Sequence, residues 1–188
     1  MNFTNDIPLC VAALQQGQTI LYPTDTIWGI GCDAKNSEAV ANIYALKKRD
    51  EKKSMIILLA HHTEIASYAQ KPNDAVLQLM AQTNNPLTII YPNAKNLAPN
   101  LINEDGTIAI RIVKDPFCIA MINAFGGPIV STSANISGEA TAPFFNMISN
   151  EIKLGVDYIV QHRQHDNTPA TPSSIVKWNT DNSFTKIR

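Results

Sequence analysis

Short continuous apolar runs along this chain alternate with segments in which apolar residues recur at helical spacing. The clearest run is Met55–Leu59, in which every residue is apolar, as is typical of a strand covered on both faces. Two further runs, Leu87–Tyr91 and Thr107–Val113, are rich in isoleucine and threonine and also predict strands. The other expected strands are Thr19–Tyr22, Pro128–Ser131, Tyr158–Gln161, Ser174–Trp178 and Phe184–Ile187.

Helix signals lie between these strands. Asn36 or Ser37 can cap a helix that runs to about Lys48, and Asp115 with Pro116 can open another that ends at Gly126. Further helices are expected over residues 6–17, from residue 73 or 74, and over 144–153. Because strands and helices interleave, we expect an α/β fold: one domain over residues 1–188, with a twisted mixed β-sheet flanked by helices and a concave substrate cleft. Residues 161–172 are predicted to form a mobile loop.

Composition narrows the class of function. The chain has 188 residues with a net charge of −1, and 16% of them are charged, against about 25% in typical proteins. A near-neutral chain argues against non-specific nucleic-acid binding as the main task. The three cysteines show no CxxC spacing, which argues against a disulfide framework or a zinc site. The longest apolar run is far shorter than the ~20 residues of a membrane span, so we expect a soluble, cytoplasmic protein.

A polar turn follows the strand at Thr19–Tyr22. Pro23 cannot donate a hydrogen bond to a β-ladder, so the strand should end there. Thr24 and Thr26 then place two hydroxyl groups where the edge of the sheet meets solvent. Gly29 follows closely and allows the backbone to return near the strand. This segment therefore predicts one wall of a polar site.

Cations cluster at Lys47, Lys48, Arg49 and Lys53, around the end of the second expected helix. Cations at a helix C-terminus stabilise the macrodipole by about 0.3–1 kcal/mol each, which is one explanation. The alternative is an anion site, since several cations beside a buried strand are costly without a counter-charge. The chain has neither a GxxxxGK[ST] loop nor a complete dinucleotide fingerprint, so side chains would have to hold a phosphate.

Two further features point to a polar ligand. Residues 131–138 supply four hydroxyl groups and an amide directly after a strand, either as a binding loop or as a capped turn. Arg111 lies among isoleucines on an expected strand, where an unpaired guanidinium would be very costly. Its expected partner is the carboxylate of Asp33, of Asp115 or of a substrate.

Taken in order along the chain, these segments resemble the YrdC/TsaC family, the threonylcarbamoyl-AMP synthases, in its short single-domain form. The matching motifs are PTDTIWGIGCDA at 23–34, Lys47-x-Arg49 with Lys53-Ser54, Thr107-x-x-x-Arg111, STSANISG at 131–138, PSSIV at 172–176 and the late Arg188. Trp28 stands where the family usually has tyrosine, and Asp50 where it usually has proline.

The resemblance implies a nucleotidyltransferase that converts L-threonine, bicarbonate or CO2, and ATP into threonylcarbamoyl-AMP and pyrophosphate. A downstream transferase would use the product to form threonylcarbamoyladenosine in tRNA. Magnesium would arrive with ATP, and no metal would be bound by the protein alone. An RNA-binding module, weak RNA contact, or another carbamoyl- or nucleotidyl-transfer enzyme on the same fold are the alternatives.

The resemblance also assigns residues to roles. The implied catalytic residues are Lys47, Arg49 and Lys53. The implied ATP contacts are Arg49, Lys53, Thr107, Ser133, Asn135, Thr141 and Arg188. The implied L-threonine contacts are Thr24, Thr26, Arg111, Ser131, Ser173 and Ser174, with one of the two last serines touching the ligand.

Overall fold

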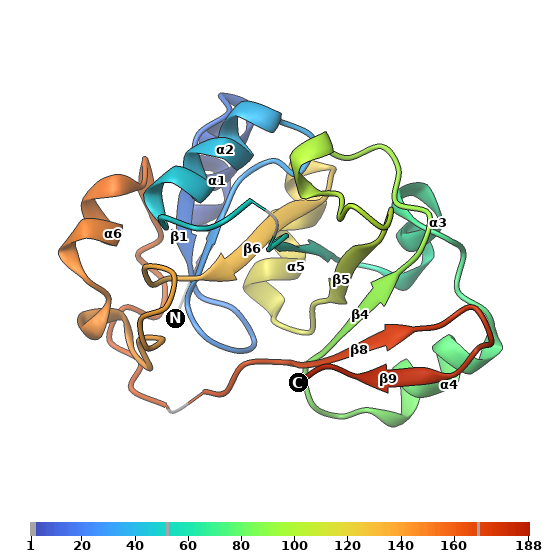
Figure 1. Cartoon of the computed structure of the whole chain (residues 1–188). Coiled ribbons are helices and arrows are strands. Elements are labelled where there is room, and N and C mark those ends of the chain that lie inside the picture. Colours follow the sequence, from blue (N-terminus) through green and yellow to red (C-terminus); the bar gives the residue numbers. More distant parts are fainter. Residues whose placement is uncertain (1–2, 52, 169) are drawn as a thin grey trace.

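Strands far apart in the sequence lie side by side in one mixed sheet (Figure 1). The computed structural model describes residues 3–51, 53–168 and 170–188. Its strands are β1 (Ile20–Tyr22), β2 (Gly29–Gly31), β3 (Ile56–Leu59), β4 (Leu87–Tyr91), β5 (Ile108–Ile112), β6 (Ile129–Ser133), β7 (Tyr158–Ile159), β8 (Ser174–Trp178) and β9 (Phe184–Lys186). They pair in the order β7-β1-β2-β6-β3-β5-β4-β8-β9. Three neighbouring pairs are parallel (β1–β7, β3–β5, β4–β8) and the other pairs are antiparallel, which confirms the predicted mixed α/β sheet.

Helices flank this sheet. They are α1 (Asp6–Gln15), α2 (Ser37–Leu46), α3 (Ile65–Tyr68), α4 (Asp74–Gln82), α5 (Pro116–Phe125) and α6 (Asn150–Gly155), with 3-10 turns at His62–Glu64, Pro99–Leu101 and Phe145–Met147. Figure 1 shows α1, α2 and α6 toward one end of the sheet and α3 and α4 toward the end with β4, β8 and β9. Two predicted caps are present: the Asn36 side chain accepts from the amide of Glu38, and Asp115 accepts from Cys118.

Two local expectations were wrong. Residues 144–153 do not form one helix: a 3-10 turn at Phe145–Met147 is followed by α6 at Asn150–Gly155. The break lies at Ser149, whose hydroxyl caps the amide of Ile152 and so starts a new helix. The strand β2 was not expected, because its Gly-Ile-Gly sequence carries little strand propensity. It forms because Ile30 pairs with Leu21 on one side and Thr132 on the other.

The core is continuous across the sheet. Ile57, Leu58 and Leu59 are no more than 1% exposed, which confirms that the Met55–Leu59 run is buried on both faces. The described residues between 161 and 172 form no strand or helix, as expected, but Arg163 ties this loop to the carbonyl of Thr24 at 3.1 Å. Its predicted mobility stays a prediction. No helix in the described part of the chain is long and apolar enough to cross a bilayer.

We expect Gly31→Ala to destabilise the fold by about 3 kcal/mol, because overpacking a filled core forces its neighbours apart. A Cβ atom at Gly31 would overlap the carbonyl oxygen of Val130 and lie 2.8 Å from Cε1 of Tyr22. Gly127→Ala is the matched control, since its Cβ would meet its nearest neighbour, Phe125, at an ordinary 3.5 Å. Urea unfolding of both variants checks this. Equal midpoints for the two variants would contradict the close approach of β2 and β6.

Candidate active site

A pocket of about 200 Å³ opens where the β1–β2 turn and strands β5, β6 and β8 come together. Polar side chains from segments far apart in the sequence line it beside the indole of Trp28. The sequence-predicted residues that line it are Thr26, Arg49, Arg111, Ser131, Ser133, Thr141, Ser173 and Arg188. The fold therefore brings eight of the expected site residues together.

Arg111 forms the floor of this pocket. Its side chain is 3% exposed, and its Nη1 donates to the hydroxyl of Thr26 at 3.0 Å. The Thr26 hydroxyl is joined to that of Thr24 at 2.9 Å. Thr24 lies behind Thr26, outside the residues that line the pocket, so it supports the site without facing it.

The ion-pair partner of Arg111 is neither Asp33 nor Asp115, so these two of the three expected partners were wrong, while the third, a substrate carboxylate, stays a prediction. Nη2 of Arg111 lies 3.3 Å from Oδ1 of Asp25. Asp33 instead accepts from the amide of Lys35, and Asp115 pairs with Arg163. The register of the strands decides which aspartate pairs with Arg111, because β5 places Arg111 on the face of the sheet that the β1–β2 turn covers. The signal for Asp25 was present in the sequence, between the two threonines of the motif.

The guanidinium of Arg111 keeps unused hydrogen-bonding capacity. Its Nε is buried and donates to no acceptor among the described residues, and Oδ1 of Asp25 likewise accepts no hydrogen bond. A buried donor left unsatisfied in this way costs free energy unless a ligand completes it. A ligand carboxylate is the group that best matches a guanidinium.

Ser173 supplies the opposite wall. Its hydroxyl is joined to that of Thr88 at 2.8 Å, and its carbonyl accepts from Nε and Nη2 of Arg188 at 3.2 and 3.0 Å. Ser173 lines the pocket, whereas Ser174 is absent from the described lining. Of the two serines left open by the sequence, Ser173 is therefore the one at the pocket.

Arg49 brings a second guanidinium to the rim. Its Nε donates to the carbonyl of Lys53 at 2.7 Å, and its Nη2 donates to that of Ser54 at 2.9 Å. These bonds fold the segment after α2 against the pocket. Burial lowers the pKa of Arg49, but an arginine stays protonated in proteins. Arg49 and Arg188 thus add fixed positive charge to the lining of the pocket.

Lys47 does not line the pocket, although it was expected to be catalytic. The residue is 1% exposed, and its ammonium donates to the backbone carbonyls of Ser133 and, at 2.5 Å, of Asn135. Its own carbonyl accepts from the amide of Ser137 at 2.8 Å. Burial, and then the neighbouring Arg49, lower the pKa of Lys47 to about 8. In this structure Lys47 therefore holds the loop that presents Ser133.

Three further expected residues, Thr107, Asn135 and Lys53, are not among the described residues that line the pocket. The hydroxyl of Thr107 donates to Asp105 at 2.6 Å and accepts from Asn103. The amide of Asn135 donates to the carbonyls of Ile136 and Glu139 and so closes its own turn. Lys53 is exposed next to Ser54, which does line the pocket. None of these three side chains is among the described lining.

The fold and the site define an α/β protein in which a mixed sheet gathers guanidinium groups and hydroxyls around one small pocket. Within this class, the chain belongs to the Sua5/YciO/YrdC family, whose model, described as "Telomere recombination", matches residues 12–188. It is 32% identical to the threonylcarbamoyl-AMP synthase of Pseudoalteromonas translucida, over 93% of this chain and 94% of that protein. The synthase of Halorhodospira halophila is 35% identical over 81% and 80%.

Solved structures share the fold. Escherichia coli YciO superposes with a TM-score of 0.84 at 22% identity, over 98% of this chain and 88% of that one. Pyrococcus abyssi Sua5 complexed with L-threonine superposes with a TM-score of 0.84 at 21% identity. The match covers 97% of this chain and 53% of Sua5, so the chain spans about half of that protein.

We expect Lys47→Met to lower the free energy of unfolding by about 2–4 kcal/mol, because it leaves two carbonyls in the protein without their donor. Lys48→Met is the matched control one residue away. The side chain of Lys48 is 66% exposed and pairs with Glu151 at the surface, so its loss should barely move the unfolding midpoint. Chemical denaturation of both variants checks this. A similar shift in both would contradict the clamp at Lys47.

We expect Asp25→Asn to cost about 3 kcal/mol of stability, since it leaves Arg111 a buried cation without a counter-charge. Asp33→Asn is its control, because an amide oxygen can still accept from Lys35. Thermal unfolding of the two variants compares them. If Asp33→Asn proves the more damaging, Asp25 is not the partner on which Arg111 depends.

Proposed function

We propose that this protein is an L-threonylcarbamoyladenylate synthase that joins L-threonine, bicarbonate or CO2, and ATP. The observation that carries the proposal is the spare, buried Nε of Arg111 in a pocket that also holds Arg49 and Arg188. The guanidinium of Arg111 suits an amino-acid carboxylate, and those of Arg49 and Arg188 suit a polyphosphate. The names of the relatives and the threonine complex of Sua5 support the same assignment.

In this proposal L-threonine lies on the floor of the pocket. Its carboxylate would bind Arg111, and the hydroxyls of Thr26, Ser131 and Ser173 would meet its polar groups. Gly29 makes room for this arrangement, because a Cβ there would lie 3.2 Å from Oγ of Ser131. Small hydroxyl donors fit a ligand that has its own hydroxyl and amine.

ATP would extend from this floor to the charged rim. Arg49 and Arg188 would contact the triphosphate, with Ser133 and Thr141 as neutral partners. Lys53, Asn135 and Thr107 would act from the margin of the site. Magnesium would enter on the phosphates, since no three His, Cys, Asp or Glu side chains gather as a metal cage within residues 3–51, 53–168 and 170–188.

The chemistry then needs positioning more than covalent help. The threonine amine adds to CO2 and loses a proton, which gives a carbamate. A carbamate oxygen attacks the α-phosphorus of ATP, and pyrophosphate leaves with the bonding electron pair. Fixed guanidinium groups stabilise the charge that builds on the phosphates, and the pocket holds the two reactants in line.

The product carries an activated carbamoyl group, so a second enzyme must accept it. We propose a tRNA-modifying transferase in the cytoplasm as that partner, in keeping with the names of the relatives. A direct RNA contact would be weak, because the chain carries 15 basic and 16 acidic residues.

The proposal predicts that pyrophosphate release from ATP requires L-threonine and bicarbonate together. An enzyme-coupled pyrophosphate assay, with each component left out in turn, checks this. L-serine is the matched control, because it lacks only the methyl group. Equal release with L-serine, or release without an amino acid, would point to another carbamoyl- or nucleotidyl-transfer reaction.

We expect Arg49→Ala to lower kcat/KM for ATP at least about tenfold, since a hydrogen bond to a charged group is worth about 1.5–3 kcal/mol. Lys48→Ala is the control, because Lys48 is exposed beside Arg49 and pairs with Glu151. Steady-state kinetics on both variants decide between an anion site and a helix-dipole role for this cluster. Equal and small losses of kcat/KM in both variants would favour the helix-dipole explanation of the cluster.

A further inference from the structure

A second cavity lies behind the sheet, on the face opposite to Arg111. It holds about 410 Å³, about twice the volume of the candidate active site, and falls in the range of small-molecule sites. Successive residues of a strand point to opposite faces, so Ile110 and Ile112 line this cavity while Arg111 lines the other. Strand β4 adds Leu87 and Ile89, and helix α4 covers them.

Polar side chains gather at one end of this cavity. Strand β4 runs antiparallel to β5 with Thr88 opposite Arg111, so the segments holding Asn85 and Lys114 meet beyond the same end. The ammonium of Lys114 donates to the carbonyl of Thr83, at the end of α4, at 2.9 Å. The side chain of Lys114 is exposed at this polar end, which we call the mouth of the cavity.

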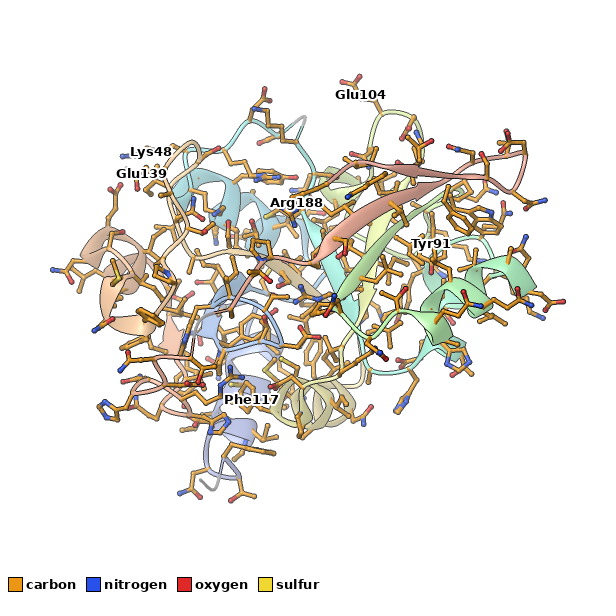
Figure 2. All side chains as sticks on the ribbon, turned by 90° about the horizontal axis from the view of Figure 1, so that it is seen from below. Lys48, Tyr91, Glu104, Phe117, Glu139 and Arg188 are labelled. Carbon is orange, nitrogen blue, oxygen red and sulfur yellow. The ribbon has the colours of Figure 1, made fainter. Side chains whose placement is uncertain are left out.

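The other end is apolar. Tyr91 is 1% exposed, and its hydroxyl contacts the sulfur of Met80 at 3.8 Å, a weak acceptor. Leu77 adjoins them on α4, one turn from Met80. Figure 2 shows Tyr91 beside α4 and away from Arg188, which belongs to the candidate active site. The cavity is therefore an apolar channel along β4 with a polar mouth.

The mouth carries one ammonium group, that of Lys114, whose backbone amide donates to the carboxylate of Asp25 at 3.3 Å. Neither Asp nor Glu occurs among the described residues that line the cavity, whereas Lys114 and His62 do. Lys114 forms no ion pair within the described chain. Its ammonium has three donors, and the carbonyls of Thr83 and Asn84 that it contacts carry no net charge. An anionic group of a ligand would give the ammonium of Lys114 a charged partner.

We propose that this cavity is a second binding site, for an amphiphilic monocarboxylate of medium chain length. The carboxylate would lie at Lys114 and the chain would follow β4 toward Tyr91. Leu87 and Tyr91 are four residues apart on β4, which at a rise of about 3.4 Å per residue gives about 14 Å, a length that suits decanoate. The site is separate from the threonine pocket, so it goes beyond the proposed function and its test does not depend on it.

Calorimetric titration of the full chain with decanoate, below its micelle concentration, tests the proposal. We expect one site per chain. Ala81→Phe should abolish binding, because Ala81 lines the cavity on α4 and is exposed, so a larger side chain there fills the space without cutting into the core. Lys114→Gln should weaken binding about fivefold, the most that one exposed ion pair contributes, whereas Lys95→Gln, elsewhere on the surface, should not.

Several results would overturn the proposal. Absence of decanoate binding by the unaltered protein would do so, as would undiminished binding by Ala81→Phe while its circular dichroism stays native. Binding of decanol as tight as that of decanoate would contradict the claim that Lys114 binds the carboxylate. A dimer in sedimentation that dissociates in Ala81→Phe would assign the cavity to a second copy of the chain instead.

Discussion

The burial of one guanidinium group organises this molecule. Arg111 lies in the middle of β5 at 3% exposure, where a cation is tolerated only with charge and hydrogen-bond partners. Asp25 and Thr26 supply them from the β1–β2 turn, which Pro23 starts by ending β1. The conformation of the turn, the strand order and the pocket therefore depend on the same contacts of Arg111. Within the described residues the arrangement leaves the buried Nε of Arg111 without an acceptor, and this spare donor is the basis of the proposed carboxylate site.

One loop of the pocket depends on a second buried cation, Lys47, which is not among the described residues that line it. Lys47 contacts the carbonyls of Ser133 and Asn135 and so fixes the loop after β6. Its position lets Arg49, two residues on, turn toward the rim and bind the carbonyls of Lys53 and Ser54. Neighbouring cations thus differ: Lys47 is buried and holds the backbone of a loop, whereas the half-buried Arg49 lines the pocket, where we propose that it meets a phosphate.

Much of this was predictable from the sequence. The apolar run Met55–Leu59, the capped helices and the polar segments after Tyr22 were found because each has a local signal. The partner of Arg111 was not, because register between distant strands decides which of several aspartates lies within reach. The break at Ser149 and the strand around Ile30 depend on a hydroxyl cap and on two neighbouring strands. The contacts of Lys47 with two carbonyls were not predicted, because a motif names a residue without giving the direction of its side chain, and its catalytic role stays a prediction.

The central claim is that Arg111 recognises the carboxylate of threonine. The most direct measurement is a calorimetric comparison of L-threonine with L-threoninol, which lacks that carboxylate, on the unaltered protein and on Arg111→Lys. The account predicts that the two losses of binding free energy are not additive. L-threoninol on Arg111→Lys should bind only slightly more weakly than L-threoninol on the unaltered protein or L-threonine on Arg111→Lys. Fully additive losses would contradict it, because they would mean that the carboxylate and Arg111 do not meet.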